Sequence, residues 1–188
     1  MQKLSKQLMT IGAVAPIAMA APIVASFFAS DYSWLSQHMS ELQLRKDMFG
    51  AVVHGGAFIA GVALLAFAIG ALLSGGIFTA ITTLAFGAGM MANGIFPMGS
   101  PLHGLYGIAI FLILTPPIFV GEFQTASEPR WFRNYSYATA IASLVYMWIL
   151  LVGLDPEAYS GLTQRIGTLI SFVWYAVAAS RVRQVAPA

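Results

Sequence analysis

The sequence predicts an all-α fold, a polytopic bundle of six transmembrane helices. Hydrophobic residues make up 59% of the 188 residues and charged residues only 9%, against roughly 25% charged in an average soluble domain. This excess of apolar side chains could not all be buried in one soluble core of this length, so a lipid bilayer is its natural solvent. The apolar runs are continuous rather than alternating with a period of two, which argues against membrane-spanning strands.

Six runs reach the length of a spanning helix, about 20 mostly apolar residues. No linker or low-complexity tract divides the chain, so we predict a single membrane domain over residues 1–188. The predicted spans are, in order, residues 10–29, 50–73, 76–96, 104–123, 134–153 and 161–180.

The first run has two interpretations. Lys3 and Lys6 precede an apolar stretch that contains "AMA" at residues 18–20, the pattern of a secretory signal with its cleavage site. The apolar stretch continues to Ala29, however, which is long enough to span a bilayer. We therefore expect an uncleaved first helix, with a signal peptide as the alternative.

The second and third spans are rich in small residues. Glycines at positions 55, 56, 61 and 70, and again at 87, 89 and 94, predict close helix packing. They lack the Lys-Ser/Thr partner of a phosphate-binding loop. The short connection at residues 74–76 makes these two spans an antiparallel hairpin.

Prolines and aromatic residues mark the boundaries of the later spans. Pro97 should end the third span, and Pro101 suits the first turn of the fourth. "TPP" at residues 115–117 should kink the fourth span. Trp131 and Phe132, flanked by arginines, are typical of an interfacial anchor before the fifth.

The distribution of Lys and Arg sets the orientation, because cytoplasmic loops carry the excess. With both termini inside, six basic residues lie inside and three outside, which predicts an N-in, C-in protein of the cell (inner, cytoplasmic) membrane. The inside residues are Lys3, Lys6, Arg130, Arg133, Arg181 and Arg183, and the outside ones are Arg45, Lys46 and Arg165.

In this orientation all three histidines, His38, His54 and His103, lie near the outer face, where Glu41 joins them. One interpretation is a hydrogen bond between His54 and Asn93 that joins two helices. A second is a divalent metal site with the three histidines as ligands and Glu41 as ligand or base. The spacing lacks any His-Glu-x-x-His pattern. A haem between His54 and His103 is a third and weaker alternative.

The segment "SQHMSEL", residues 36–42, also allows a serine hydrolase with Ser36 or Ser40 as nucleophile, although no nucleophile elbow is present. Helix capping explains these residues more simply, with Ser36 and Met39, or Ser40 and Gln43, as N-cap and N3 residues. We expect Glu41 to form an ion pair with Arg165 that holds this loop over the bundle.

Three short motifs resemble an uncharacterised family of bacterial and archaeal membrane proteins, domain of unknown function 998. They are Ser40-Glu41-Leu42, Gly94-Ile95-Phe96-Pro97 and Leu102-His103-Gly104. The resemblance implies a six-helix fold over about residues 8–180, with Glu41, Pro97 and His103 at family-type positions, and no established activity. This chain departs from the family pattern at Gln43, usually glycine, and at Met98 and Gly99, where the family often has an acidic residue.

The expected function is binding or moving a lipid or small amphipathic molecule in an outward-facing cleft between the second, third, fourth and sixth spans. His54, Asn93 and His103 would contact its head group, and Glu41 with Arg165 would close the loop. The alternatives are a metal-dependent membrane hydrolase with Glu41 as catalytic base, and a structural subunit of an oligomer or of a larger assembly. The small net charge of +2 does not support nucleic-acid binding, and the absence of cysteine excludes thiolate chemistry.

Overall fold

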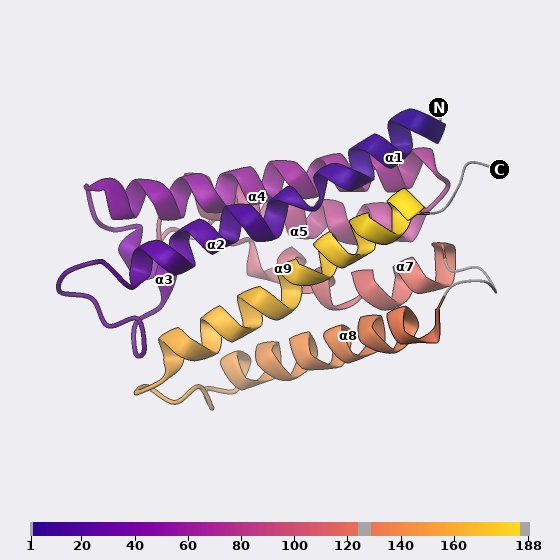
Figure 1. Ribbon diagram of the computed structural model, residues 1–188. Coiled ribbons are helices and arrows are strands. Elements are labelled where there is room, and N and C mark those ends of the chain that lie inside the picture. The colour runs from indigo at the N-terminus through magenta and orange to yellow at the C-terminus, as the bar shows by residue number, and fades with distance from the viewer. Residues whose placement is uncertain (1, 124–128, 185–188) are drawn as a thin grey trace.

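The computed structural model describes residues 2–123 and 129–184, and within those ranges the chain is helical and contains no strand (Figure 1). The all-α prediction is confirmed. One 3₁₀ turn, η1 (Ile110–Ile113), accompanies the α-helices. These are α1 (Gln2–Ile11), α2 (Val14–Ser26), α3 (Met39–Leu42), α4 (Met48–Leu73), α5 (Ile77–Ile95), α6 (Tyr106–Ala109), α7 (Thr115–Phe123), α8 (Arg130–Leu151) and α9 (Ser160–Gln184).

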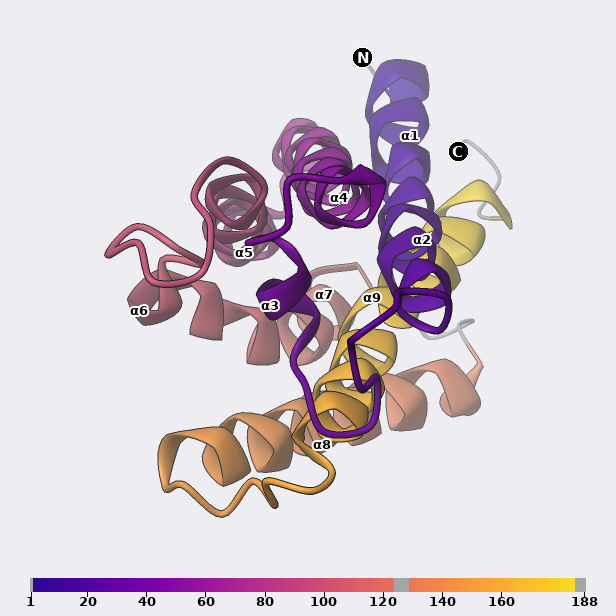
Figure 2. The same cartoon turned by 90° about the vertical axis from the view of Figure 1, so that its left-hand side faces the viewer.

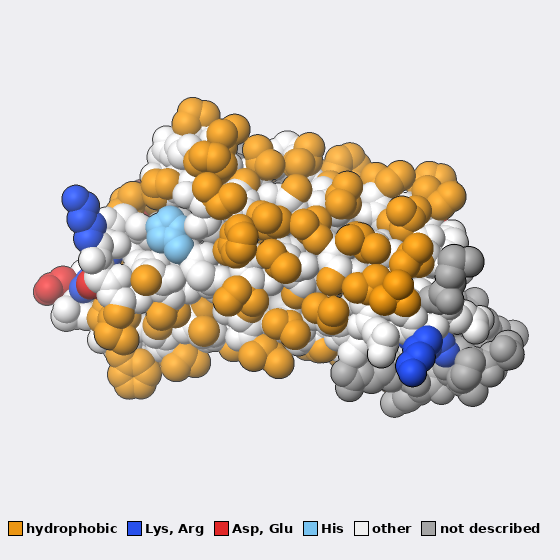
Figure 3. Space-filling view, turned by 90° about the horizontal axis from the view of Figure 1, so that it is seen from above, with side chains coloured by type: hydrophobic (Ala, Val, Ile, Leu, Met, Phe, Trp, Pro, Cys, Tyr) orange, Lys and Arg blue, Asp and Glu red, His pale blue; other side chains and the backbone are white. Residues whose placement is uncertain are grey.

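Three helical segments in the described ranges are long and apolar enough to cross a membrane: Gln2–Ser26, which joins α1 and α2, Met48–Leu73 and Ile77–Ile95. With 22 and 25 residues, α8 and α9 are long enough as well, but neither is apolar enough to belong to this set. On the face seen in Figure 3, apolar side chains cover the middle of the molecule, and charged side chains lie toward its two ends. The count of six spans stays a prediction.

The first predicted span differs from the structure in its start and its continuity. The helix begins at Gln2 rather than near residue 10, and it is interrupted between α1 and α2. Pro16 lacks the N–H that would bond the Gly12 carbonyl oxygen in a continuous helix, and the Ala15 N–H donates to that oxygen instead, at 3.1 Å. The early start is held in place because the Ser5 hydroxyl donates to the Gly70 carbonyl oxygen on α4 at 2.9 Å.

The predicted fourth span is not one continuous helix. Residues 104–123 form α6, η1 and α7 in succession, so the break is larger than the expected kink. Pro116 and Pro117 follow the first residue of α7, where missing N–H donors cost no helical hydrogen bond. A continuous helix would leave the carbonyl oxygens of Leu112 and Ile113 without these donors. Glu122 of α7 accepts from the Phe78 and Thr79 N–H groups, both at 2.9 Å, and so caps the start of α5.

Small residues bring α4 close to its neighbours on two sides, as predicted. A Cβ atom added at Gly56 would lie 2.7 Å from the Ala18 carbonyl oxygen of α2. One added at Gly61 would lie 2.6 Å from the Met91 backbone nitrogen of α5. Gly55 differs, because no atom lies within 4 Å of a Cβ built there. Gly70 packs in the same way against α1, where an added Cβ would lie 2.7 Å from the Ser5 carbonyl oxygen. The glycines of α4 that pack against another helix therefore face α1, α2 or α5.

An aromatic core fills the space between α4, α7 and α9. The Phe67 ring of α4 lies 5.3 Å from the Tyr175 ring and 6.0 Å from the Phe119 ring, centroid to centroid. Trp174, fully buried, packs edge-on against Phe119 at 5.4 Å, and its indole N–H donates to the Ser136 hydroxyl of α8 at 2.9 Å. This core ties α8 to the rest of the bundle.

Both ends of the described chain lie at one end of the bundle, and α3 lies at the other (Figures 1 and 2). The α3 end includes the segment 27–47, here called the first loop, and the segments 96–105 and 152–159. Asp47 ends the first loop by capping α4, since its carboxylate accepts from the Phe49 and Gly50 N–H groups. The Arg45 guanidinium, 2.6 Å away, lowers the pKa of the Asp47 carboxyl.

Candidate functional site

A cavity of about 180 Å³ lies directly beneath α3. Six helices, one residue of the first loop and the segment 103–112 contribute to its wall, so it is formed by tertiary packing rather than by any one element. The wall is made of Met19 of α2, Met39 and Ser40 of α3, Gln43 of the first loop, Val53 and Ala57 of α4, Phe86, Met90 and Asn93 of α5, His103, Gly104 and Leu112 of the segment 103–112, Tyr146, Met147 and Leu150 of α8, and Gln164, Gly167, Thr168, Ser171 and Phe172 of α9.

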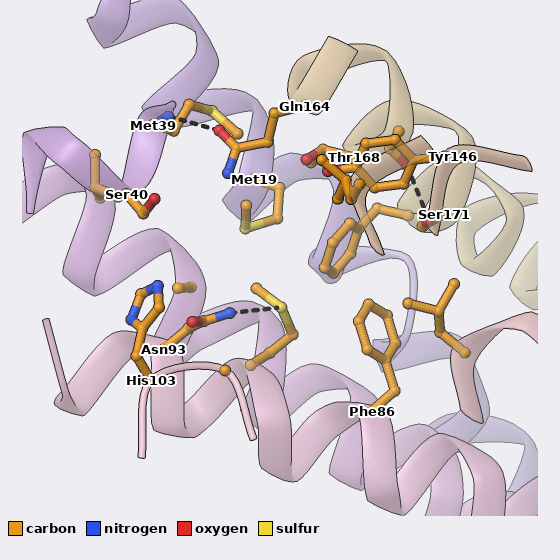
Figure 4. Close-up of a pocket in the computed structure, with 18 of the residues that line it drawn as sticks. Met19, Met39, Ser40, Phe86, Asn93, His103, Tyr146, Gln164, Thr168 and Ser171 are labelled. Carbon is orange, nitrogen blue, oxygen red and sulfur yellow. Dashed lines mark hydrogen bonds between the residues drawn. The ribbon is translucent and has the colours of Figure 1, made fainter. Parts of the chain in front are cut away.

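The wall is polar on the side of α3 and mostly apolar on the other. Figure 4 shows Ser40, Asn93 and His103 on one side of the cavity and Phe86 on the opposite side. The cavity lies among the four spans of the predicted cleft, with two differences. The prediction omitted the first span, from which Met19 of α2 reaches the cavity wall. It also omitted the fifth span, whereas α8 contributes to the wall, because Gly167 of α9 leaves room for the Tyr146 ring of α8, whose nearest atom would lie 2.5 Å from an added Cβ.

Asn93 and His103, both predicted as site residues, meet at the polar side. His103 is 7% exposed, and its Nδ1 lies 2.8 Å from the Phe96 carbonyl oxygen. A carbonyl oxygen only accepts, so Nδ1 carries the proton in this contact. The Asn93 Nδ2 contacts the Met90 sulfur at 3.8 Å, and the Asn93 Oδ1 is buried with no hydrogen-bond partner.

The predicted hydrogen bond between His54 and Asn93 is wrong, although His54 does join α4 to α5. Its Nδ1 lies 2.8 Å from the Gly94 carbonyl oxygen, and its Nε2 lies 3.2 Å from the Gln43 carbonyl oxygen. The close approach of Gly94 to Phe58, where an added Cβ would lie 2.6 Å from the Phe58 nitrogen, brings the α5 backbone within reach of the ring. Both ring nitrogens therefore face backbone oxygens, and His54 does not line the cavity.

The capping prediction for α3 named the wrong residues. The N-cap is His38 and the N3 residue is Glu41, whose Oε1 accepts from the His38 backbone N–H at 2.8 Å. The other carboxylate oxygen of Glu41 accepts from Gln37 Nε2 at 3.0 Å. The His38 ring lies 3.6 Å from the Asp155 carboxylate. Glu41 and His38 thus hold the first loop in shape, and neither lines the cavity.

Arg165 holds the first loop in place, as expected. It does not bond Glu41, however, so the predicted ion pair between Glu41 and Arg165 is wrong. Arg165 is 3% exposed and donates to neutral oxygens: Ser26 Oγ at 3.2 Å, Gly161 O at 2.6 Å, Gln37 O at 3.3 Å and Tyr32 Oη at 2.8 Å. Its guanidinium also lies 5.7 Å from the centre of the Tyr32 ring. The Glu41 carboxylate already accepts hydrogen bonds from Gln37 and His38. Backbone and hydroxyl oxygens of the first loop therefore accept from Arg165 instead. Burial raises the pKa of Tyr32, and the Arg165 hydrogen bond offsets only part of this effect.

The first loop also touches the segment after α5. The Ser40 hydroxyl donates to the Met98 sulfur at 3.6 Å. Ser36 and Ser40 have no histidine base among their hydrogen-bond partners in the structure, since Ser36 bonds Ser33. The serine-hydrolase alternative therefore has no geometric support.

The three histidines are not gathered into one site. Across residues 2–123 and 129–184, no group of three or more His, Asp or Glu side chains is placed to hold a metal ion. His38 contacts Asp155, His54 faces backbone oxygens and only His103 lines the cavity. This geometry supports neither the metal-dependent hydrolase nor a haem held by His54 and His103.

Sequence reasoning missed two polar residues of the cavity wall, Gln43 and Gln164. Gln43 donates from Nε2 to the Asn93 backbone oxygen at 2.7 Å, and Gln164 accepts from the Met39 N–H at 2.6 Å. Gln164 could have been found, because Ser160, Gln164, Thr168 and Ser171 follow the helical spacing of one inward face. Gln43 lies in a loop, where no periodicity marks it.

The fold and the cavity define a class, a helical protein with membrane-length apolar segments and an amphipathic cavity between its helices. The chain belongs to the family described as Protein of unknown function (DUF998), which matches residues 13–181. The resemblance seen in the three short motifs is thereby confirmed. No curated protein and no solved structure matches the chain.

Proposed function

We propose that this protein is a six-span protein of the cell membrane that binds a lipid or another small amphipathic molecule in the cavity beneath α3. The observation that carries the proposal is the division of the cavity wall. Gln43, Asn93, His103 and, across the cavity from them, Gln164 supply polar atoms at the end nearest α3, and an apolar surface continues from Met90 along α5 and α8. Binding sites for small molecules are mostly apolar with a few placed polar groups.

The volume of the cavity limits how much of the ligand it can enclose. A volume of about 180 Å³ exceeds the roughly 150 Å³ that holds benzene in an engineered cavity. It is smaller than the roughly 300–1,000 Å³ of pockets that enclose drug-sized ligands. The cavity therefore accommodates a head group and the first part of one chain, and the rest of the chain extends beyond it.

A photoreactive labelling experiment tests this function. Ten-carbon chains that carry a diazirine and end in a hydroxyl, a methyl ether or a carboxylate are added to the protein in nanodiscs, and crosslinked peptides are mapped by mass spectrometry. We expect crosslinks at Phe86, Met90 or Met147 from at least one of the three chains. Ala57→Leu should remove them, because the larger side chain fills the cavity from α4.

Ala51→Leu is the matched control for Ala57→Leu. It makes the same change on the same helix at an exposed position, so labelling should be retained. The melting temperature of both variants shows whether each remains folded. Labelling of lipid-facing residues alone by all three chains would contradict the proposed function, as would cavity labelling that Ala57→Leu leaves unchanged.

The orientation is part of the proposal and is supported by the positions of the two chain ends and of α3 at opposite ends of the bundle (Figure 1). Arg181 of α9 lies 5.9 Å from the centre of the Trp131 ring of α8, so basic and aromatic residues meet at the end opposite α3. We propose that this end is cytoplasmic.

The orientation predicts the labelling of single cysteines in a chain that has none. In intact cells, an impermeant maleimide should react with a cysteine at position 38 and not with one at position 131. Both positions suit the experiment, since the His38 side chain is 28% exposed and Trp131 is 53% exposed. After the membrane is permeabilised, both should react. The reverse pattern in intact cells would place α3 in the cytoplasm.

A further inference from the structure

The polar side of the cavity contains two carboxamide oxygens that lack partners. Gln43 Oε1 and Asn93 Oδ1 are both buried, and neither accepts a hydrogen bond in the structure. Both residues line the cavity, and Gln43 is only 5% exposed. Buried polar atoms in proteins are nearly always hydrogen-bonded, so two unpaired acceptors in one cavity indicate that a donor belongs there.

The orientation of the Gln43 side chain is fixed by its other end. Its Nε2 lies 2.7 Å from the Asn93 backbone oxygen. A carbonyl oxygen accepts and never donates, so the nitrogen must occupy that position. The oxygen is therefore the atom presented to the cavity, and an exchange of the two amide atoms would place two acceptors face to face.

Gln164, on the opposite wall, presents the nitrogen end of its carboxamide to the cavity. Its Oε1 accepts from the Met39 backbone N–H at 2.6 Å, so its Nε2 is the end left for the cavity. Figure 4 shows Gln164 across the cavity from Asn93 and His103. The wall thus offers acceptors on one side and a donor on the other.

No Lys, Arg, Asp or Glu is among the described residues that line the cavity. A charged head group would lose its hydration without gaining a partner of opposite charge, which is unfavourable in an apolar surrounding. The head group must also both donate and accept. A carboxylate or an ether only accepts, and an ammonium only donates, whereas a hydroxyl does both.

Resting on the proposed function, we infer that the cavity selects an uncharged hydroxyl head group on an apolar chain. The hydroxyl donates to Gln43 Oε1 or Asn93 Oδ1 and accepts from Gln164 Nε2. The ligand class is therefore a long-chain alcohol or another lipid that ends in a neutral hydroxyl, rather than an anionic lipid or a fatty acid.

Competition against the hydroxyl-ended diazirine chain tests the selection. The competitors are 1-decanol, decyl methyl ether and decanoate, each expressed as its mole fraction in the nanodisc so that partitioning cancels. We expect 1-decanol to displace the labelling chain at a mole fraction at least about tenfold lower than the ether requires, because the ether leaves the buried oxygens unpaired. Decanoate should compete no better than the ether.

Asn93→Leu should reduce the preference for 1-decanol over the ether. It removes Oδ1 but keeps the backbone oxygen that Gln43 binds, so the first loop stays attached to α5. Ala51→Leu, at an exposed position on α4 outside the cavity, should keep the preference. The melting temperatures of both variants verify that they are folded.

The outcomes separate the two proposals. Cavity labelling with equal competition by 1-decanol and the ether would overturn the hydroxyl selection and leave the binding function standing. Stronger competition by decanoate would also overturn it, as would an unchanged preference in folded Asn93→Leu. If none of the three diazirine chains labels the cavity, the binding function fails, and the selection fails with it.

Discussion

Replacing Arg165 with methionine should lower the free energy of unfolding by about 3 kcal/mol, because hydrogen bonds to a charged group each contribute roughly 1.5–3 kcal/mol and desolvation of the guanidinium offsets part of their sum. Arg165 is nearly fully buried and donates to Ser26 at the end of α2 and to Tyr32 and Gln37 of the first loop. Methionine keeps the apolar stem and removes every donor. The loss should therefore fall on the first loop.

Two measurements check the Arg165→Met prediction. Equilibrium unfolding in mixed micelles of dodecyl sulfate and dodecyl maltoside gives the free energy, and hydrogen exchange should show faster exchange over residues 27–38 than in the wild type. Arg133→Met, at an exposed position on α8, is the control and should change stability little. Equal losses in the two variants would show that Arg165 does not hold the loop.

Gly61→Ala should destabilise the protein by at least about 2 kcal/mol, since overpacking in a tight contact costs roughly 1–3 kcal/mol or more. The added Cβ would lie 2.6 Å from the Met91 backbone nitrogen and 2.8 Å from the Gly87 oxygen. Those are backbone atoms of α5, so no side chain can turn away to relieve the contact. The two helices would have to separate.

Gly55→Ala on the same helix is the matched control for Gly61→Ala. No atom lies within 4 Å of the added Cβ, so this variant should be neutral or more stable by up to about 1 kcal/mol, through helix propensity alone. The same micelle unfolding experiment measures both variants. Changes of the same sign and size would mean that the close approach of α4 and α5 contributes nothing to stability.

Local features of the sequence were sufficient to predict the helical class and its packing surfaces. Composition and unbroken apolar runs predict helices because a helix bonds its own backbone, which any apolar solvent requires. Glycines predicted the close approach of α4 and α5 for a similar reason, since the absence of a side chain is a property of the residue itself. Three short motifs were enough for the family.

Predictions of specific partners were less successful. His54 bonds the backbone of Gly94 rather than the Asn93 side chain, and Arg165 bonds oxygens of the first loop rather than Glu41. In each case the residue was correctly expected to join two elements, and the partner was wrong. Every residue carries a backbone oxygen, so a sequence cannot indicate which of them will lie within reach of a donor.

The sequence by itself determined that this chain is helical, rich in membrane-length apolar segments and a member of its family, because these depend on composition, periodicity and short motifs. Only the tertiary structure decided that Gln43 and Gln164 meet across one cavity and that the Gln43 and Asn93 oxygens have no partner there. The physical reason is that the pairing of a polar atom depends on which distant segments surround it. That neighbourhood exists only after the helices have packed.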